Sequence, residues 1–340
     1  MNNERKSLVP LAPLTTFKIG GLARVFIEAR NDAEMEDAIK CAHELNLPVF
    51  PIGAGSNILV PDEGVEGVVI KMSPSEIIFE DEGDETILIS SAGTKWEKIV
   101  DAAGERGLFG IENLAGIPGT LGGAVVQNIG AYGAELSNSF EYADCIDSSS
   151  GEHKRITRSG ADFGYRTSFF KKYRKLIVIR AALRLSKNAS KNIAYPDLVR
   201  ASENGIPLTT PSEISRAIRA IRAEKFPYSQ GEGTAGSFFK NPVIPEALAN
   251  SLKEHFPDLP IFPQKGSEVK VSLAWLLDHA LSLKGFSKGN VRLYENQPLV
   301  IVARNGATAS EVDEFAREIA KRVLSATGIT IEREVEMFGE

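Results

Sequence analysis

Cysteine is scarce in this sequence, and its histidines are scattered. Only two of the 340 residues are cysteines, Cys41 and Cys145, and they lie far apart. So few cysteines exclude a disulfide framework and favour a reducing compartment, so we expect a cytoplasmic protein. The histidines lack the spacing of metal ligands, and we expect no metal site; they are His43, His153, His255 and His279.

Long apolar runs and an excess of positive charge are missing as well. No apolar run approaches the roughly 18 residues that span a bilayer, and the start of the chain carries charge without the apolar core of a signal peptide. The formal net charge is −6, whereas broad nucleic-acid binding needs a basic surface. We therefore expect no membrane or nucleic-acid partner. A monomer is expected separately. The charge still leaves room for a local basic pocket that binds a phosphorylated ligand.

What is present is the composition of an ordinary globular protein. Hydrophobic residues make up 43% of the chain and charged residues 25%, as in typical folded domains. A chain of 340 residues exceeds the size at which one hydrophobic core keeps growing, so we expect two or three domains. Proline and glycine residues place the boundaries near residues 72 and 220.

Apolar periodicity predicts both helices and strands. Helices are predicted to begin near Asp32, Thr94, Thr210, Ser272 and Thr308. Those at Thr210 and Thr308 begin with capping boxes, because a glutamate follows three residues later. Strands are predicted at residues 48–52, 67–71 and 86–90, and alternating apolar residues predict a last strand at 329–337. This mixture indicates an α+β or α/β protein.

A first glycine-rich segment follows the predicted strand 48–52. It consists of Gly53, Ala54, Gly55, Ser56 and Asn57. Successive N–H groups in such a segment form a cradle for a pyrophosphate. The dinucleotide-binding fingerprint of the Rossmann fold needs a third glycine, where this chain has Ile58, and the lysine of a P-loop is missing. An ordinary tight turn is the alternative.

A second glycine-rich region lies further along the chain, among apolar residues. Its two parts contain Gly116, Ile117, Pro118, Gly119, Gly122 and Gly123, and then Asn128, Gly130 and Ala131. Flexible linkers are usually polar. Glycine-rich main chain among apolar residues is instead usually buried against another part of the protein or a ligand. Together the glycine-rich segments favour a nucleotide cofactor, although glycine alone does not identify it. A purely structural pair of loops is the alternative.

Six spaced motifs resemble the UDP-N-acetylenolpyruvoylglucosamine reductase family. They occur in family order over nearly the whole chain: 15–21 (TTFKIGG), 53–57 (GAGSN), 115–133, 163–166 (FGYR), 236–242 (GSFFKNP) and 332–335 (EREV). The resemblance implies an α+β fold. Its FAD-binding domain, of the vanillyl-alcohol-oxidase and p-cresol-methylhydroxylase type, has two subdomains at 1–72 and 73–220. A C-terminal α+β substrate-binding domain follows at 221–328, and the strand at 329–340 returns near the first subdomain.

The same resemblance implies the reaction and its participants. Bound FAD accepts hydride from the co-substrate NADPH and reduces UDP-N-acetylglucosamine enolpyruvate to UDP-N-acetylmuramate in peptidoglycan precursor synthesis. The partners are therefore NADPH and a UDP-linked enolpyruvyl sugar. The glycine-rich segments named above and Arg222 are the implied FAD-binding residues.

Three catalytic residues are carried over by resemblance. Ser237 would donate a proton to the substrate, and Arg166 would bind the developing carboxylate charge, a task that suits a bidentate guanidinium. Glu334 would assist in placing charge and proton. Each residue also has a purely structural alternative. Ser237 would be a turn serine and Arg166 a surface arginine, and the alternating glutamates of 329–337 would form a solvated strand face. Register alone separates Glu334 from Glu332, and the family often has a basic residue where this chain has Glu336.

Substrate-binding residues are implied as well. Tyr195 matches a loop found in the longer of two subclasses of the family, and its ring would close over the UDP group. Lys225 and Asn241 match positions that contact the diphosphate and the uridine. A basic series at helical spacing, Arg216, Arg219, Arg222 and Lys225, could face phosphates. For Arg216 and Arg219 we favour a solvated face.

Two other functions compete with this interpretation. One is an oxidase of the same flavoprotein superfamily that uses dioxygen, which would share the glycine-rich segments without needing the 236–242 motif or the Tyr195 loop. The other is a non-catalytic nucleotide-binding module, which would be colourless when purified.

Overall fold

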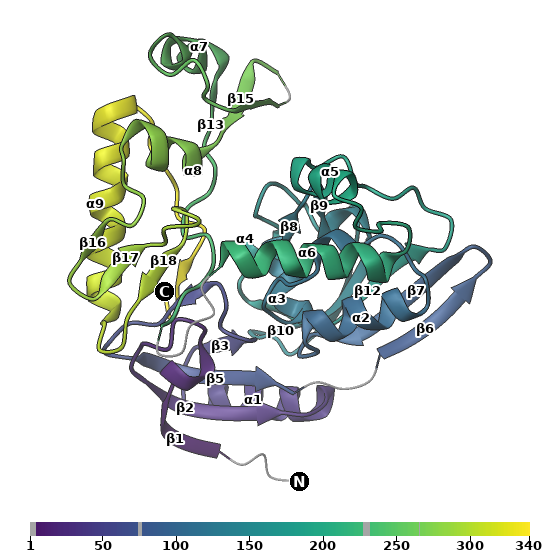
Figure 1. Ribbon diagram of the computed structural model, residues 1–340. Coiled ribbons are helices and arrows are strands. Elements are labelled where there is room, and N and C mark those ends of the chain that lie inside the picture. Colours follow the sequence, from purple (N-terminus) through teal and green to yellow (C-terminus); the bar gives the residue numbers. More distant parts are fainter. Residues whose placement is uncertain (1–4, 74–76, 227–231, 265) are drawn as a thin grey trace. The chain divides into compact units, whose positions relative to one another are not determined.

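A computed structural model describes residues 5–73, 77–226, 232–264 and 266–340 (Figure 1). The chain forms two compact units. The first contains residues 1–9, 23–54 and 66–223, and the second contains residues 10–22, 55–65 and 224–340. Both units are therefore discontinuous in sequence, and each is described by itself. The finer division at residues 72 and 220 stays a prediction.

The first unit contains a four-stranded sheet with the order β1-β2-β5-β3. Its strands are β1 (Arg5–Pro10), β2 (Leu22–Ala29), β3 (Val49–Ile52) and β5 (Val65–Met72), and β3 runs parallel to β5. Helix α1 (Asp32–Glu44) buries Met35, Ala38, Ile39 and Ala42, as the periodicity predicts. Its N-cap is Asn31, whose side chain accepts a hydrogen bond from Glu34, so the predicted cap at Asp32 was one residue late.

The second sheet of this unit is antiparallel and has the order β11-β10-β12-β7-β6. Its strands are β6 (Ile77–Glu82), β7 (Glu85–Ser91), β10 (Phe140–Asp147), β11 (His153–Thr157) and β12 (Leu176–Ser186). Figure 1 shows helix α6 (Pro211–Lys225) lying across this part of the unit with α2 (Trp96–Glu105) and α3 (Leu121–Gln127). Trp96, Leu121 and Ile218 belong to one buried apolar cluster, which joins these helices to the sheets.

Short elements complete the first unit. They are α4 (Phe169–Lys172), α5 (Pro196–Glu203), the hairpin strands β8 (Gly130–Ala131) and β9 (Ala134–Glu135), and the 3-10 turns Glu112–Leu114 and Leu136–Asn138. Helix α2 begins after Lys95 rather than at Thr94. Thr94 is buried, and its hydroxyl accepts from Ser90 instead of capping the helix.

The second unit contains short strands and a long helix. Its strands are β4 (Ile58–Leu59), β13 (Val243–Pro245), β14 (Ile261–Pro263), β15 (Glu268–Val271), β16 (Ser287–Lys288), β17 (Val291–Leu293), β18 (Ile301–Ala303) and β19 (Glu336–Met337). Its helical elements are a 3-10 turn (Ala12–Leu14), α7 (Glu246–His255), α8 (Leu273–Trp275) and α9 (Ala309–Thr327). Both sides of the Thr308–Glu311 capping box form, and Gly328 ends α9 with φ of 71°.

Two predicted elements of this unit need correction. The helix predicted from Ser272 starts there, with Ser272 accepting from Trp275, but it continues as a π-helical turn (Leu276–Ala280) and stops before Leu283. The strand predicted at 329–337 is wrong over most of its length, because only Glu336–Met337 pairs regularly, in parallel with β4. The N–H groups of Glu334 and Val335 both point to the Phe238 carbonyl, at 2.8 and 3.4 Å, which is the pattern of a β-bulge and interrupts the strand.

In the described part of the chain, no helix is both long enough and apolar enough to cross a membrane.

Candidate active site

The two predicted glycine-rich segments touch in the first unit. Gly53 directly follows β3, and a Cβ added to it would lie 2.6 Å from Oγ1 of Thr120. A side chain at residue 53 would have to displace the Thr120 hydroxyl, so the main chain of Gly53 packs closely on the residue that precedes α3. The neighbouring Ala54 is exposed. Thr120 was missed from the sequence because its role depends on this contact between distant segments.

The remainder of the first segment belongs to the second unit. Gly55 has φ of +61°, and a Cβ on it would lie 2.4 Å from the Leu14 carbonyl oxygen, so glycine is required sterically. Ser56 and Asn57 are half-buried. The Asn57 Nδ2 group donates to the main-chain oxygen of Glu334 at 3.0 Å, and the Asn57 carbonyl accepts from Glu336 at 3.1 Å. This glycine-rich segment therefore holds the main chain on both sides of residue 335.

Arg222 lies against the start of the second glycine-rich region. Its Nε donates to the Gly116 carbonyl at 2.9 Å, and its Cδ would be 3.0 Å from a Cβ on Gly116. The Gly116 N–H donates to Glu97 at 2.9 Å. Ile117 and Gly119 are half-buried and Pro118 is exposed. The loop is thus held at its first residue by one cation and one anion.

Two adjacent glycines in α3 have different surroundings. A Cβ on Gly122 would lie 2.9 Å from Cβ of Ala92, so close packing explains that glycine. Gly123 is exposed, and a Cβ there would meet only Oγ1 of Thr120, at an ordinary 3.8 Å. Glycine within a helix costs roughly 0.5–1 kcal/mol relative to alanine. Packing among the described residues therefore leaves space for a side chain at Gly123.

Asn128 supports the rest of this region from within. It is fully buried with φ of +45°, and its side-chain amide donates to Glu135 and to the Gly164 carbonyl while accepting from the N–H of Ser137. The strands β8 and β9 follow, with Gly130 and Ala131 half-buried. The side chain of Asn128 is thus used in holding the loop.

Arg166 lies over Gly130 in the same unit. Its Nη2 donates to the Gly130 carbonyl at 2.5 Å, and a Cβ on Gly130 would lie 2.6 Å from its Nη1. Arg166 has φ of +55° in a tight turn closed by hydrogen bonds between Gly164 and Thr167. Non-glycine residues in this conformation are strained and concentrate at functional sites. This half-buried guanidinium is therefore not the surface arginine of the alternative interpretation.

Ser237 and Glu334 come together in the second unit. Gly236, with φ of +74°, turns the chain into Ser237, which pairs with Val300. The next residue, Phe238, accepts a hydrogen bond from the Glu334 N–H at 2.8 Å. Ser237 and Glu334 are both half-buried. The chain thus brings a hydroxyl and a carboxylate onto adjoining segments.

The structure also separates Glu334 from Glu332. The Glu332 side chain is 73% exposed and forms an ion pair with Lys240 at 3.0 Å. Glu334 instead lies in the bulge, with its N–H and carbonyl both held by the protein. The solvated-face interpretation fits Glu332, whereas Glu334 is half-buried.

Tyr195 lies at the start of α5 in the first unit. Its carbonyl accepts from Leu198 and Val199, and its ring packs edge-on against Tyr132, with centroids 5.1 Å apart and 73° between planes. Partial burial, and then the Asp197 carboxylate, raise the pKa of its hydroxyl above the ordinary value. The hydroxyl therefore stays protonated and able to donate at neutral pH.

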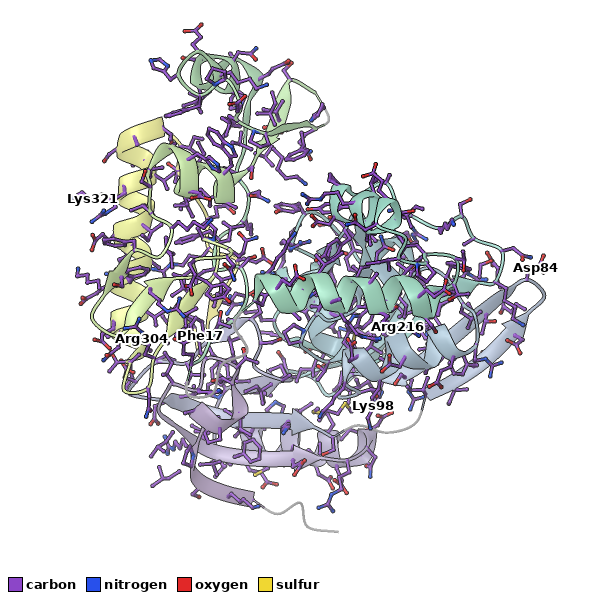
Figure 2. All side chains as sticks on the ribbon, viewed as in Figure 1. Phe17, Asp84, Lys98, Arg216, Arg304 and Lys321 are labelled. Atoms are coloured by element: carbon purple, nitrogen blue, oxygen red, sulfur yellow. The ribbon has the colours of Figure 1, made fainter. Side chains whose placement is uncertain are left out.

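The other predicted binding residues differ in their surroundings. The Asn241 Oδ1 atom accepts from the Leu273 N–H at 3.0 Å and so caps α8. Lys225 is the last residue of α6 and is half-buried. Arg216 is exposed on α6 (Figure 2), as expected for a solvated face. Arg219 is half-buried, and its guanidinium is paired with the partly exposed carboxylates of Glu97 and Asp101.

Asn113 is a further residue that the sequence prediction missed. It is buried, and its Nδ2 donates to the carbonyls of Tyr132 and Asn192. A lone asparagine in an apolar, glycine-rich stretch was the available signal. Within the described ranges, no group of three or more histidine, cysteine, aspartate or glutamate side chains could hold a metal ion.

Comparison with known families adds sequence evidence to this geometry. Residues 23–157 match the model of a FAD binding domain, and residues 227–338 match that of the UDP-N-acetylenolpyruvoylglucosamine reductase C-terminal domain. The predicted fold class, an α+β protein with a FAD-binding domain followed by a C-terminal domain, is thereby confirmed.

Individual relatives match over almost their whole length. The UDP-N-acetylenolpyruvoylglucosamine reductase of Pseudomonas aeruginosa is 38% identical over 341 residues, which cover 99% of this chain and 100% of that protein. The reductase of Shigella boydii is 34% identical, over 97% of this chain and 95% of that protein. The crystal structure of the Thermus caldophilus reductase has a TM-score of 0.68 at 26% identity and covers 99% of both chains. The chain belongs to the UDP-N-acetylenolpyruvoylglucosamine reductase family.

Proposed function

We propose that this chain is the FAD-dependent, NADPH-consuming reductase that converts UDP-N-acetylglucosamine enolpyruvate to UDP-N-acetylmuramate in peptidoglycan precursor synthesis. Family membership over the whole chain gives the reaction. The observation that carries the assignment of residues is the pairing of the Ser237 segment with Glu334 through the Phe238 carbonyl. This pairing puts a hydroxyl and a carboxylate on adjoining segments, which supports a shared task in proton transfer.

The residues present fit a flavin dinucleotide. The main chain at Gly123 is exposed, and among the described residues a Cβ there would meet only Thr120, so there is room for a ligand to lie against it. We propose that the two glycine-rich segments, with Arg222, hold FAD: Gly53 to Asn57, Gly116 to Gly119, Gly122 and Gly123, and Gly130 and Ala131. Asn128 would act through its buried hydrogen bonds, as a support of the loop. When bound, FAD takes a hydride from NADPH and passes it to the enol-ether β-carbon of the substrate.

The protein must then stabilise the charge that the hydride creates. Addition at the β-carbon moves negative charge toward the α-carbon and its carboxylate. A permanently charged guanidinium is suited to binding that carboxylate, and we assign this role to Arg166. Its strained backbone and its bond to Gly130 fix it before the substrate arrives, and such preorganised charge favours the transition state.

A proton completes the reduction at the α-carbon. We assign its donation to Ser237: the Oγ–H bond breaks as the new C–H bond forms. A hydroxyl is a weak acid, but it suffices toward a strongly basic, enolate-like carbon when it is within hydrogen-bond reach. Within the described ranges, no protein group forms a hydrogen bond with the Ser237 hydroxyl. Glu334 assists by its charge and as a proton-holding group beside this segment.

Three residues are proposed to hold the UDP group. The protonated hydroxyl of Tyr195 is suited to donating to a diphosphate, and Lys225 supplies a positive charge for the same group. The Asn241 Nδ2 group is the donor left after Oδ1 has capped α8, and an amide of this kind suits the edge of a uracil ring.

The location and assembly of the protein are also proposals. Both cysteines are free, and burial raises the pKa of the Cys145 thiol to about 12, so this thiol stays protonated and unreactive. We propose a monomer that works in the cytoplasm, where precursor synthesis would serve cell-wall growth, cell shape and division.

An anaerobic absorbance titration tests the function. NADPH should bleach the flavin of the purified, yellow protein, and UDP-N-acetylglucosamine enolpyruvate should then restore the oxidised spectrum. A colourless protein that cannot be loaded with FAD would support the non-catalytic module. Reoxidation by dioxygen but not by the enolpyruvyl substrate would support the oxidase.

A further inference from the structure

The segment that leads to Tyr195 is tied to the glycine-rich region by one buried side chain. The Asn113 Nδ2 group donates to the Tyr132 carbonyl at 2.8 Å and to the Asn192 carbonyl at 2.7 Å. The Asn192 Nδ2 group in turn donates to the Gly133 carbonyl at 3.0 Å. Three hydrogen bonds within the first unit therefore join the Tyr132–Gly133 turn, residue 113 and the segment before Tyr195.

The two asparagines differ in burial. Asn113 is 2% exposed and uses both N–H bonds of its amide, whereas its Oδ1 is buried with no hydrogen-bond partner in the described structure. Asn192 is exposed. An aspartate or leucine at residue 113 could not donate to either carbonyl. We call these three hydrogen bonds the tether. The two that Asn113 donates come from its buried side chain.

The turn on the other side of the tether is strained. Tyr132 has φ of +48°, at a hairpin position where asparagine or glycine is preferred. Its buried ring packs edge-on against Tyr195. A residue in this conformation persists only when its surroundings hold it, and Asn113 holds its carbonyl. The aromatic contact and the hydrogen bonds therefore act on the same segment.

We propose that Asn113 is a positioning residue that orders the segment 188–195 and so prepares Tyr195 for the UDP group. This inference rests on the proposed function, in which Gly130 and Ala131 contact FAD and Tyr195 contacts UDP. Binding to a preordered segment costs less conformational entropy than binding to a mobile one. Since β8 leads directly into the Tyr132–Gly133 turn, occupation of the FAD site should also order the Tyr195 segment, and the coupling must be reciprocal.

The test compares Asn113→Leu with the wild-type protein, both loaded with FAD. Hydrogen exchange of the amides in segment 188–195 should become faster, while exchange in β10 and β12 stays unchanged. The affinity for UDP should fall by about tenfold, since the two hydrogen bonds from Asn113 no longer order the segment. KM for the enolpyruvyl substrate should rise more than kcat falls, and bleaching of the flavin by NADPH should stay close to normal.

Two further variants make the result decisive. Asn192→Ala removes only the bond to Gly133 from an exposed position, so it should show a smaller change in the same direction even if Asn113→Leu folds poorly. Asn188→Ala is the matched control in the same segment, because its side chain has no hydrogen-bond partner in the part of the chain that is described. Unchanged exchange and UDP affinity in both Asn113→Leu and Asn192→Ala would overturn the proposal, as would faster exchange without any loss of affinity. The hydrogen-exchange comparison needs no substrate. A wild-type protein that fails to bind UDP would therefore count against the proposed function, while the exchange rates would still show whether Asn113 orders the segment 188–195.

Discussion

At the scale of single residues, three strained positions lie in the glycine-rich region and its neighbouring turn. Asn128, Tyr132 and Arg166 all have positive φ without being glycine. Hydrogen bonds hold all three residues. Arg166 donates to the Gly130 carbonyl, Asn128 donates to the Gly164 carbonyl, and the Tyr132 carbonyl accepts from Asn113. Such conformations cost of order 1–3 kcal/mol each, and they persist where the surrounding structure holds them.

Ser237→Ala separates the two half-reactions. The variant should retain reduction of FAD by NADPH, because that step needs no proton from Ser237. Oxidation of the reduced flavin by the enolpyruvyl substrate should slow by roughly 10²–10⁴-fold, the usual contribution of a positioned acid. Rapid-mixing absorbance measures both steps, and an equal loss in the two would contradict the role of proton donor.

Glu334→Gln and Glu332→Gln form a matched pair. The first should slow the substrate half-reaction by about 10²-fold or more, the range expected when a charge near the reacting atoms is removed. The second loses only an exposed ion pair with Lys240, which is worth at most about 1 kcal/mol of stability. Single-turnover rates of the two variants compare them directly. A larger defect in Glu332→Gln would mean that the register is wrong.

Tyr195→Phe should weaken binding rather than chemistry. A hydrogen bond to a charged group contributes about 1.5–3 kcal/mol, so UDP affinity should fall by roughly 10–100-fold. Because the pKa of this hydroxyl is raised, it keeps its proton at a pH where an ordinary tyrosine starts to lose it, and this part of the affinity should be lost only at a correspondingly higher pH. Calorimetric titration measures it. Normal affinity with slower turnover would rule out this role.

At the scale of elements, capping chemistry was the most dependable signal. Both capping boxes form, at Thr210–Glu213 and at Thr308–Glu311, because each needs only residues three positions apart. The hydrogen bonds from Thr209 and Thr210 lower the pKa of Glu213. The prediction of the last strand was wrong over most of its length. The alternation correctly indicated burial, because Ile329, Ile331 and Val335 are buried. Strand formation, however, also depends on a neighbouring strand with which to pair.

Gly123→Ala tests the use of bare main chain in α3. The FAD-free protein should gain roughly 0.5–1 kcal/mol in stability, because alanine favours the helix and has space there. Its affinity for FAD should fall by about tenfold or more. Denaturant unfolding and flavin fluorescence quenching measure the two effects. The control is Gly122→Ala, which should cost about 1–3 kcal/mol through its clash with Ala92; unchanged FAD affinity in Gly123→Ala would remove this glycine from the flavin site.

At the scale of the whole molecule, the chain divides into two discontinuous units. Residues 10–22 and 55–65 belong to the unit that also contains the C-terminal part, so β4 pairs with β19 across most of the sequence. The Gly53–Asn57 segment is divided between the units along the chain, and FAD bound only by the native state would stabilise that state.

Adding FAD to the flavin-free protein should therefore raise its unfolding temperature. A ligand that binds only the native state at 100 times its Kd adds about 2.7 kcal/mol of stability. Thermal unfolding followed by circular dichroism, at several FAD concentrations, measures the rise. Riboflavin is the control, because it lacks the phosphates that the glycine-rich segments would hold. An equal shift with riboflavin would contradict a phosphate-binding role for those segments.

Features that depend on local chemistry can be predicted from the residues alone. Capping boxes, apolar periodicity and glycine-rich segments are readable because propensity and side-chain spacing act over a few residues. The family motifs added the fold class and the reaction. Only the tertiary structure decided which residues meet: Thr120 against Gly53, Arg166 over Gly130, Glu334 rather than Glu332 beside the Ser237 segment, and Asn113 between two loops. Those contacts join segments far apart in the chain, and their geometry follows from the packing of the whole unit, which no local pattern contains.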